Sequence, residues 1–264
     1  MDIFLIFGLI GGVVTIVVGM IVKGADVSIL LNPAAAIIII VGTIMAVINS
    51  FPKRDILNVG RVMGVLFREK AGHDPCTTIR ELVALSQTAR KEGLLALEQV
   101  AEKESNPFMK KGLSMVVDGI EQKYVRDVLE IDIESMEERH KAGAQIFFVA
   151  GGAAPTLGVL GAVVGLIGAL ANLNDTEKLA HMIAAAFVAT LFGIFFGYVV
   201  CHPFCSRLKR KSTEEVHVLR LMMEGILSIQ AGDNPKSIEM KLLSMIEPKE
   251  RAHYDKAAAS GKGE

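Results

Sequence analysis

The sequence contains no tryptophan and only three cysteines, so it has neither a tryptophan belt for membrane edges nor a disulfide framework. Cys76, Cys201 and Cys205 suit a reducing compartment. The net charge is -1, which excludes the strongly basic surface of a nucleic-acid-binding protein. Because no G-x-G-x-x-G, Walker A or H-E-x-x-H motif occurs, nothing in the sequence indicates an enzyme or a bound cofactor.

Charged side chains are also missing from four long apolar runs, which cover residues 3–22, 32–51, 142–174 and 182–206. A helix needs about 20 apolar residues to cross the hydrocarbon of a bilayer, so each run predicts a transmembrane helix. At about 1.5 Å per residue the third run exceeds one bilayer thickness. Its helix is therefore expected to project beyond the lipid or to kink at Pro155. The first run lacks the basic flank and cleavage site of a signal peptide, and we interpret it as a retained span.

Basic residues gather at one end of each of the last three runs: Lys53, Arg54, Arg139, Lys141, Arg207, Lys209, Arg210 and Lys211. The positive-inside rule places these ends, and hence both termini, in the cytoplasm. The expected fold is an all-α membrane protein with a helical cytoplasmic domain between spans two and three and a helical cytoplasmic C-terminal segment. The expected division is 1–51 for transmembrane helices 1 and 2, 52–141 for the cytoplasmic domain, 142–206 for transmembrane helices 3 and 4, and 207–264 for the C-terminal helices and tail.

The polar segments show helical spacing of apolar residues. One helix is expected from Cys76 to Glu104, closed by the breaker "SNP", and another from Tyr124 to Arg139. A further helix follows the fourth run and ends at "GDNP", where the next begins and continues through Met245. Residues 253–264 are expected to form a disordered tail.

Glycines on the third run form a smooth ridge: Gly158, Gly161, Gly165 and Gly168. Small residues let helix backbones approach closely in lipid, where apolar surface alone does not hold helices together. The ridge, together with the pairs Gly8/Gly12 and Gly193/Gly197, predicts tight packing within the bundle or between copies.

The four runs contain no Asp, Glu, Lys or Arg. Ion pathways usually mark themselves with such residues, so any proton-carrying carboxylate must come from another chain. Cys201, His202 and Cys205 lie together in "CHPFC", but no fourth ligand for a metal is at hand. Pro155 allows both an ordinary membrane-helix kink and a functional one.

Five segments then occur in order: "NPAAAIIIIVGT", "ARKEGLLALE", "APTLGVLGAVVGLIGAL", "AAAFVATLFGIFFGY" and "HPFCSRLKRKS". With the topology above, residues 5 to 245 resemble the A subunit of the bacterial flagellar motor stator, the MotA/PomA family. The resemblance implies a homo-oligomeric ring, a pentamer, around a dimer of a MotB-like B subunit that supplies the membrane aspartate. It also implies a multi-pass protein of the bacterial cytoplasmic (inner) membrane, in which proton flow drives torque on a FliG-like rotor switch-complex protein.

The resemblance implies site residues as well. The positions that match the family's residues for ion flow and its coupling to movement are Pro155, Thr156, Ala162, Thr190 and Pro203. Rotor binding is carried over to Arg90 and Glu98, with Lys91 and Glu92 able to share or replace the role. On one continuous helix, Arg90 and Glu98 can lie near the same exposed face. The glycine ridge is expected to pack around the partner's helices.

The choice of ion also follows from the resemblance. Sodium-driven members carry threonine where this chain has Ala162, so the expected coupling ion is the proton. Two alternatives remain open. One is a related proton-driven energiser subunit, ExbB/TolQ-like, which has three spans and an external N-terminus. The other is a non-conducting membrane scaffold.

Overall fold

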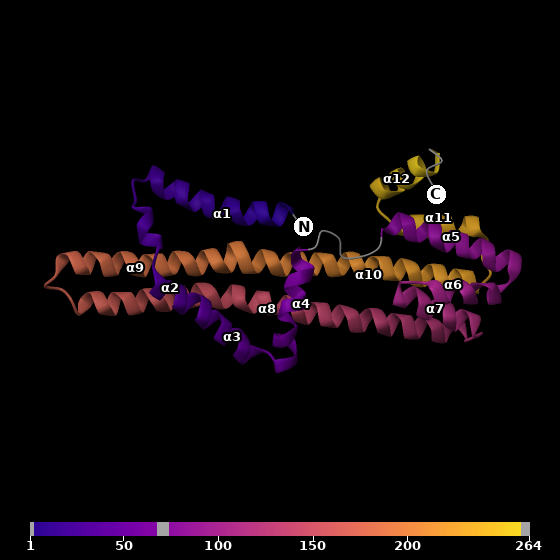
Figure 1. The fold of residues 1–264 in the computed structure, drawn as a ribbon, viewed down its shortest axis with the longest axis horizontal. Coiled ribbons are helices and arrows are strands. Elements are labelled where there is room, and N and C mark those ends of the chain that lie inside the picture. Colours follow the sequence, from indigo (N-terminus) through magenta and orange to yellow (C-terminus); the bar gives the residue numbers. More distant parts are fainter. Residues whose placement is uncertain (1–2, 68–73, 260–264) are drawn as a thin grey trace. The chain divides into compact units, whose positions relative to one another are not determined.

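The structure is a computed structural model that describes residues 3–67 and 74–259. Within these residues every regular element is a helix (Figure 1). In chain order the elements are α1 (Ile3–Val22), η1 (Val27–Leu30), α2 (Pro33–Ala36), η2 (Ile37–Val41), α3 (Gly42–Ser50), α4 (Lys53–Phe67), α5 (Pro75–Glu92), η3 (Leu94–Leu97), α6 (Glu98–Lys103), α7 (Pro107–Val117), α8 (Gln122–Leu170), α9 (Thr176–Phe195), η4 (Phe196–Cys201), α10 (His202–Gln230), α11 (Pro235–Met245) and α12 (Pro248–Ala259).

The chain divides into two compact units. Unit 1 comprises residues 1–69 and 140–210, and unit 2 comprises residues 70–139 and 211–264. α4 belongs to unit 1, whereas the expected division at residues 52, 142 and 207, which concerns position relative to the membrane, stays a prediction. Leu66 of α4 is fully buried in a cluster with Phe147 and Phe204, whose rings meet edge to face 5.8 Å apart.

Four helical stretches are long and apolar enough to cross a membrane, which confirms the four expected long apolar helices. The first, Ile3–Val22, has the bounds of the first apolar run. The second, Val27–Ser50, begins earlier than its run because η1 precedes α2. Asn32 starts α2 by accepting a hydrogen bond from the backbone N–H of Ala35, and Pro33 occupies the first helical position.

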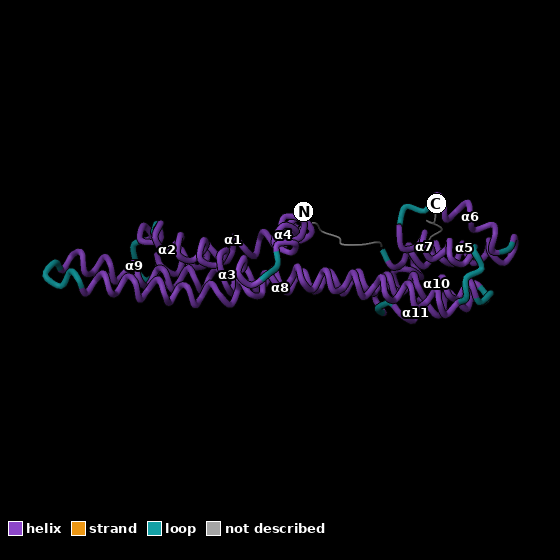
Figure 2. Tube along the Cα trace, turned by 90° about the horizontal axis from the view of Figure 1, so that it is seen from below, coloured by secondary structure: helices purple, strands orange, loops and turns teal. Residues whose placement is uncertain are grey.

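The third stretch lies in α8, which runs without a break from Gln122 to Leu170. Residues 124–139 are helical as expected, but the expected end of this helix at residue 139 is wrong, because these residues form the beginning of α8. The only weak helix former at the junction is Gly143, and one glycine costs a helix about 1 kcal/mol. A methyl group at Gly143 would lie 2.9 Å from Cγ2 of Val62 in α4, so the missing side chain lets α4 pack closely against α8. Figure 2 shows the unbroken course of α8.

Unit 2 is built around one apolar core. Its fully buried side chains come from α5, η3, α7, α8, α10 and α11 and include Ile79, Leu82, Leu97, Leu113, Leu129, Leu221, Ile226 and Leu242. The helix expected from Cys76 to Glu104 is interrupted at Gly93, whose φ of 88° favours glycine and stops α5. η3 and α6 follow, and α7, which the sequence analysis missed, begins with Asn106 capping Phe108 and Met109.

The disordered tail expected at 253–264 is wrong for residues 253–259, because α12 continues to Ala259. Tyr254 is buried, and its hydroxyl donates a hydrogen bond of 2.9 Å to Glu239 of α11. Burial and this hydrogen bond raise the pKa of Tyr254 to about 12. The part of the expectation that concerns residues 260–264 lies outside the described residues.

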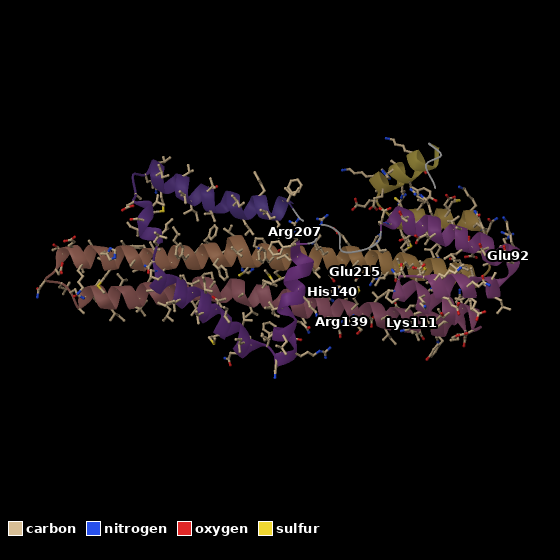
Figure 3. All side chains as sticks on the ribbon, viewed as in Figure 1. Glu92, Lys111, Arg139, His140, Arg207 and Glu215 are labelled. Carbon is tan, nitrogen blue, oxygen red and sulfur yellow. The ribbon has the colours of Figure 1, made fainter. Side chains whose placement is uncertain are left out.

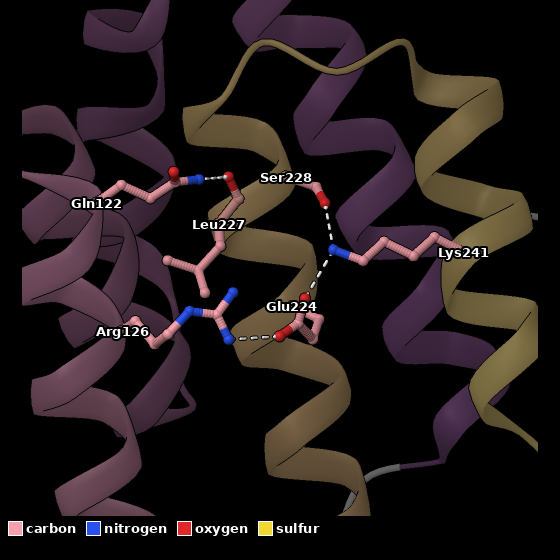
Figure 4. A network of polar contacts seen from close by, with 6 residues as sticks. All are labelled: Gln122, Arg126, Glu224, Leu227, Ser228 and Lys241. Atoms are coloured by element: carbon pink, nitrogen blue, oxygen red, sulfur yellow. Dashed lines mark hydrogen bonds and ion pairs between the residues drawn. The ribbon is translucent and has the colours of Figure 1, made fainter.

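A polar network joins α8, α10 and α11 in unit 2 (Figure 4). Glu224 accepts hydrogen bonds from Arg126 at 2.8 Å and from Lys241 at 2.6 Å. Lys241 also donates to the hydroxyl of Ser228 at 3.1 Å. Burial raises the pKa of the Glu224 carboxyl, but the two cationic donors outweigh burial and lower it overall.

Glu224→Gln is expected to destabilise unit 2 by about 1 kcal/mol, since both cations are partly screened by solvent. Because the folded-state pKa is lowered, the stabilisation is present above the unfolded value of about 4.3 and is lost as the pH falls through the folded value. Thermal unfolding between pH 7 and 3 measures this, and the variant should lose less stability on acidification than the parent. As a control, Asp132→Asn breaks the exposed Lys111–Asp132 pair and should change stability by less than about 0.5 kcal/mol.

Candidate functional site

α8 and α9 pack against each other through small residues, and we call this contact the glycine seam. A methyl group at Gly158 would lie 2.9 Å from the carbonyl oxygen of Ala189 and 3.1 Å from Cα of Gly193. One at Gly165 would lie 2.9 Å from Cβ of Ala186, and one at Gly168 would lie 2.6 Å from Cε of Met182. Residue numbers rise along α8 as they fall along α9, so the two helices are antiparallel.

The ridge packs within the bundle, which is one of the two arrangements that the sequence predicts. Gly158, Gly161, Gly165 and Gly168 face α9 of the same chain, not an open surface. The sequence pattern identified a close approach of backbones but not its partner. Packing of these glycines against a partner's helices stays a prediction.

Pro155 lies at one end of the seam, inside α8. A proline has no N–H, so the carbonyl of Gly151 lacks its usual helical donor. Gly197 packs closely against this carbonyl and against the proline ring. A methyl group at Gly197 would lie 2.6 Å from the Gly151 oxygen and 2.9 Å from Cδ of Pro155. Gly197 belongs to η4, a π-helical segment, and π-bulges are frequent at functional sites. Two backbone irregularities therefore meet, one on each helix.

His202 directly follows η4. Its ring covers Gly151, where a methyl group would lie 3.0 Å from three ring atoms. It also packs at 5.1 Å against the ring of Tyr198 and at 5.6 Å against the ring of Phe148. Sequence reasoning left His202 without a role. Pro203, the next residue, is exposed in the first turn of α10.

The other residues expected to guide ions are spread over unit 1. Thr156 is exposed, and its hydroxyl donates to the carbonyl of Gly152 at 3.1 Å. Ala162 is half-buried. Thr190 contacts Gly158 across the seam, and no hydrogen bond between described residues joins Thr190 to Thr156.

Thr190 also lines an open groove of ≈ 500 Å³ in unit 1. α1 contributes Ile16, and α9 contributes Phe187, Leu191, Ile194 and Phe195. The Thr190 hydroxyl is the one polar side-chain group among these residues. The groove therefore offers a largely apolar surface with a single oxygen.

Arg90 and Glu98 do not share a helix. Arg90 lies in the last turn of α5 and Glu98 begins α6, with the break at Gly93 between them. The argument that a continuous helix places both on one face is wrong for this reason. Both residues are nevertheless exposed, as are Lys91 and Glu92.

Charged and apolar side chains are segregated in the structure. In Figure 3 the sticks along α1, α9 and the part of α8 that belongs to unit 1 are mainly carbon, while nitrogen and oxygen gather on the elements of unit 2, including the labelled Glu92, Lys111 and Glu215. Among the described residues no group of His, Cys, Asp and Glu could hold a metal ion. Within the four apolar runs the polar groups are therefore backbone carbonyls, uncharged hydroxyl, amide and thiol side chains, and His202.

Comparison with known proteins places this chain among proteins of bacterial motility. Residues 100–221 match the MotA/TolQ/ExbB proton channel family. Motility protein A of Bacillus subtilis (strain 168) is 48% identical over 268 residues, which cover 100% of this chain and 98% of that protein. Chemotaxis protein PomA of Vibrio alginolyticus is 32% identical over 252 residues, 96% of this chain and 98% of that protein.

Solved structures agree. A chain of the C. jejuni MotAB structure matches with a TM-score of 0.90 at 31% identity, over 94% of this chain and 97% of that one. A chain of the flagellar MotAB stator complex from Bacillus subtilis matches with a TM-score of 0.88 at 49% identity, over 94% of this chain and 98% of that one. The chain therefore belongs to the motility protein A family, the A subunits of the bacterial flagellar stator within the MotA/TolQ/ExbB proton channel family.

Proposed function

We propose that this chain forms, with a MotB-like B subunit, a complex in the bacterial inner membrane that converts proton flow into torque on the rotor. The observation that carries the proposal is the pairing of four candidate spans with the absence of Asp, Glu, Lys and Arg from the four apolar runs. Such a chain can line an ion path but needs a carboxylate from a partner. The matched chains come from MotAB complexes, which supports a partner of this kind.

The test is complementation. Together with its B subunit, the chain should restore swimming to cells that lack their own stators. A non-conducting scaffold would restore no swimming, and its complex with the B subunit would conduct no protons. An energiser subunit of the ExbB/TolQ type would instead restore outer-membrane transport and leave the cells non-motile.

We further propose that unit 2 and both termini lie in the cytoplasm. Basic residues at the ends of the apolar runs support this, because the cytoplasmic ends of spans carry an excess of Lys and Arg. A cysteine introduced at Ala25 should then react with a thiol reagent added outside the cell, and a cysteine introduced at Glu92 should not.

A pentameric ring around a dimer of B subunits is the assembly that we propose. The support is the large apolar surface that the single chain leaves exposed. Only 6% of the most apolar 18-residue stretch of α1 is buried within the chain, and only 22% of that of Val27–Ser50. Since α9 occupies the glycine seam, the groove beside Thr190 is the more suitable surface for a second helix. Native mass spectrometry of the solubilised complex gives the stoichiometry, and equal numbers of A and B chains would contradict the ring.

The proposed coupling ion is the proton. A sodium ion leaving water needs several oxygen ligands, whereas a carboxylate takes up a proton without such a cage. Ala162 supplies only a methyl group, and Thr190 is the one hydroxyl in its groove.

Swimming speed is therefore expected to follow the proton-motive force and to stay unchanged between sodium-free and sodium-rich medium. Speed is measured by tracking cells in potassium and sodium buffers of equal ionic strength. Cells carrying a sodium-driven stator serve as the control and should stop in potassium buffer. Loss of swimming without sodium would show that backbone carbonyls near Pro155 act as ligands.

Rotor binding is proposed for Arg90 and Glu98. Both are exposed charges of unit 2 beside a break in the helix, and neither forms an ion pair with another described residue. The exposed Leu95 lies between them in η3 and adds an apolar contact.

A further inference from the structure

A small pocket of ≈ 110 Å³ opens beside Arg90 in unit 2. α5 contributes Ser86, Ala89 and Arg90 to its lining, and η3 contributes Leu94. The end of α10 contributes Gln230, and the turn that follows contributes Asp233. Segments far apart in the sequence therefore share this site.

Apart from Arg90, the polar side chains that line the pocket are Ser86, Gln230 and Asp233. The Gln230 side chain donates from Nε2 to the carbonyl of Ile120 at 2.6 Å, while its buried Oε1 has no hydrogen-bond donor. The Ser86 hydroxyl donates to the carbonyl of Val83 at 2.7 Å, so its oxygen is left as an acceptor. The Gln230 oxygen has no accessible surface and Ser86 is buried, so the carboxylate of the exposed Asp233 is the acceptor that a ligand can reach.

Asp233 adds a negative charge to these acceptors. Its backbone N–H donates to the carbonyl of Ser228 at 3.1 Å and so ends α10, with Gly232 at a φ of 76°. The helix end thus needs the backbone of Asp233 but not its carboxylate. No ion pair or hydrogen bond between described residues uses that carboxylate.

The remaining walls are apolar, formed by Ala89, Leu94 and Ile229. Long basic side chains lay their carbon stems along apolar surface and keep the charged head group among acceptors. Water occupies about 30 Å³ per molecule in the liquid, so the cavity holds roughly three waters or one ammonium or guanidinium head group. A lysine or arginine side chain matches both kinds of wall.

Arg90 lies on the same pocket and carries the opposite charge to Asp233, yet the two form no ion pair. A partner surface that presents a basic and an acidic side chain side by side fits both. We propose that the pocket binds a basic side chain of the rotor protein through the carboxylate of Asp233, while Arg90 pairs with a neighbouring carboxylate. The proposal rests on the stator function and identifies Asp233 as a rotor-contact residue.

The test uses the full chain with its B subunit in cells that lack other stators. Asp233→Lys should abolish swimming, and Asp233→Asn should reduce it, while the amount of complex in the membrane stays unchanged. Binding of the purified complex to the purified rotor switch-complex protein should weaken about tenfold with Asp233→Lys. Reversal of one basic residue of the rotor protein to glutamate should restore swimming to that variant.

Glu130→Lys is the matched control, because Glu130 is an exposed acidic residue of unit 2 outside the pocket, and it should swim like the parent. If the parent swims and Asp233→Lys swims equally well, the pocket proposal is wrong and the stator function stands. If Arg90→Glu also has no effect, the rotor contact lies elsewhere. If the parent restores no swimming, the proposed function and this inference fail together.

Discussion

Gly193→Leu is expected to prevent unit 1 from folding. A Cβ atom at this position would lie 2.6 Å from the carbonyl oxygen of Ala154 and 2.9 Å from Cα of Gly158. Both are backbone atoms of α8, so neither can move aside alone, and a leucine adds further carbon atoms to the same collision. Inserting atoms into a tightly packed contact costs about 1–3 kcal/mol, and more where the backbone must separate. We expect little folded chain in the membrane.

A graded series makes this test sharp. Gly193→Ala gains about 1 kcal/mol of helix propensity but meets the same backbone atoms, so it should still lower the thermal stability. Gly152 lies on α8, and no atom lies within 4 Å of a methyl group there. Gly152→Ala should therefore raise the stability by about 0.5–1 kcal/mol. Thermal unfolding of the detergent-solubilised chain measures both, and equal effects at the two positions would contradict the seam.

Pro155→Ala is expected to abolish torque while the complex still assembles. Alanine supplies the N–H that the Gly151 carbonyl lacks, and the restored hydrogen bond stiffens α8 at the point where η4 packs on it. A proline inside a helix costs about 3 kcal/mol, so the variant should unfold at a higher temperature than the parent. The proposed coupling role of Pro155 requires α8 to bend there, and the substitution removes this flexible point.

The measurements are swimming speed, the yield of purified complex and its thermal stability. Pro33→Ala is the control: Pro33 begins α2, where a backbone N–H has no helical partner in any case, and swimming should be unchanged. A Pro155→Ala complex that swims like the parent would show that movement does not use this position. Failure to assemble would instead assign Pro155 a purely structural role.

Much of the fold was predictable from local sequence. An uncharged run of suitable length can cross a membrane in few ways, and α1 accordingly has the bounds of its run. Asx-Pro pairs likewise mark helix starts: Asp74 precedes α5, Asn106 precedes α7, and Asn234 precedes α11. The spacing of small residues identified the glycine ridge, but the residues for ion flow and rotor binding could be named only by resemblance, because no motif among them specifies a chemistry by itself.

Tertiary structure decided what local sequence leaves open. The sequence determined that small residues line one face of the third run, but a glycine ridge has no chemistry that selects its partner, and only the fold assigns it to α9. Arg90 and Glu98 were separated by the backbone conformation of Gly93, which a helical spacing of apolar residues does not reveal. The pocket at Asp233 exists because α5 and the end of α10 pack together. Helix lengths and caps depend on neighbouring residues, whereas a site depends on contacts between segments far apart in the chain.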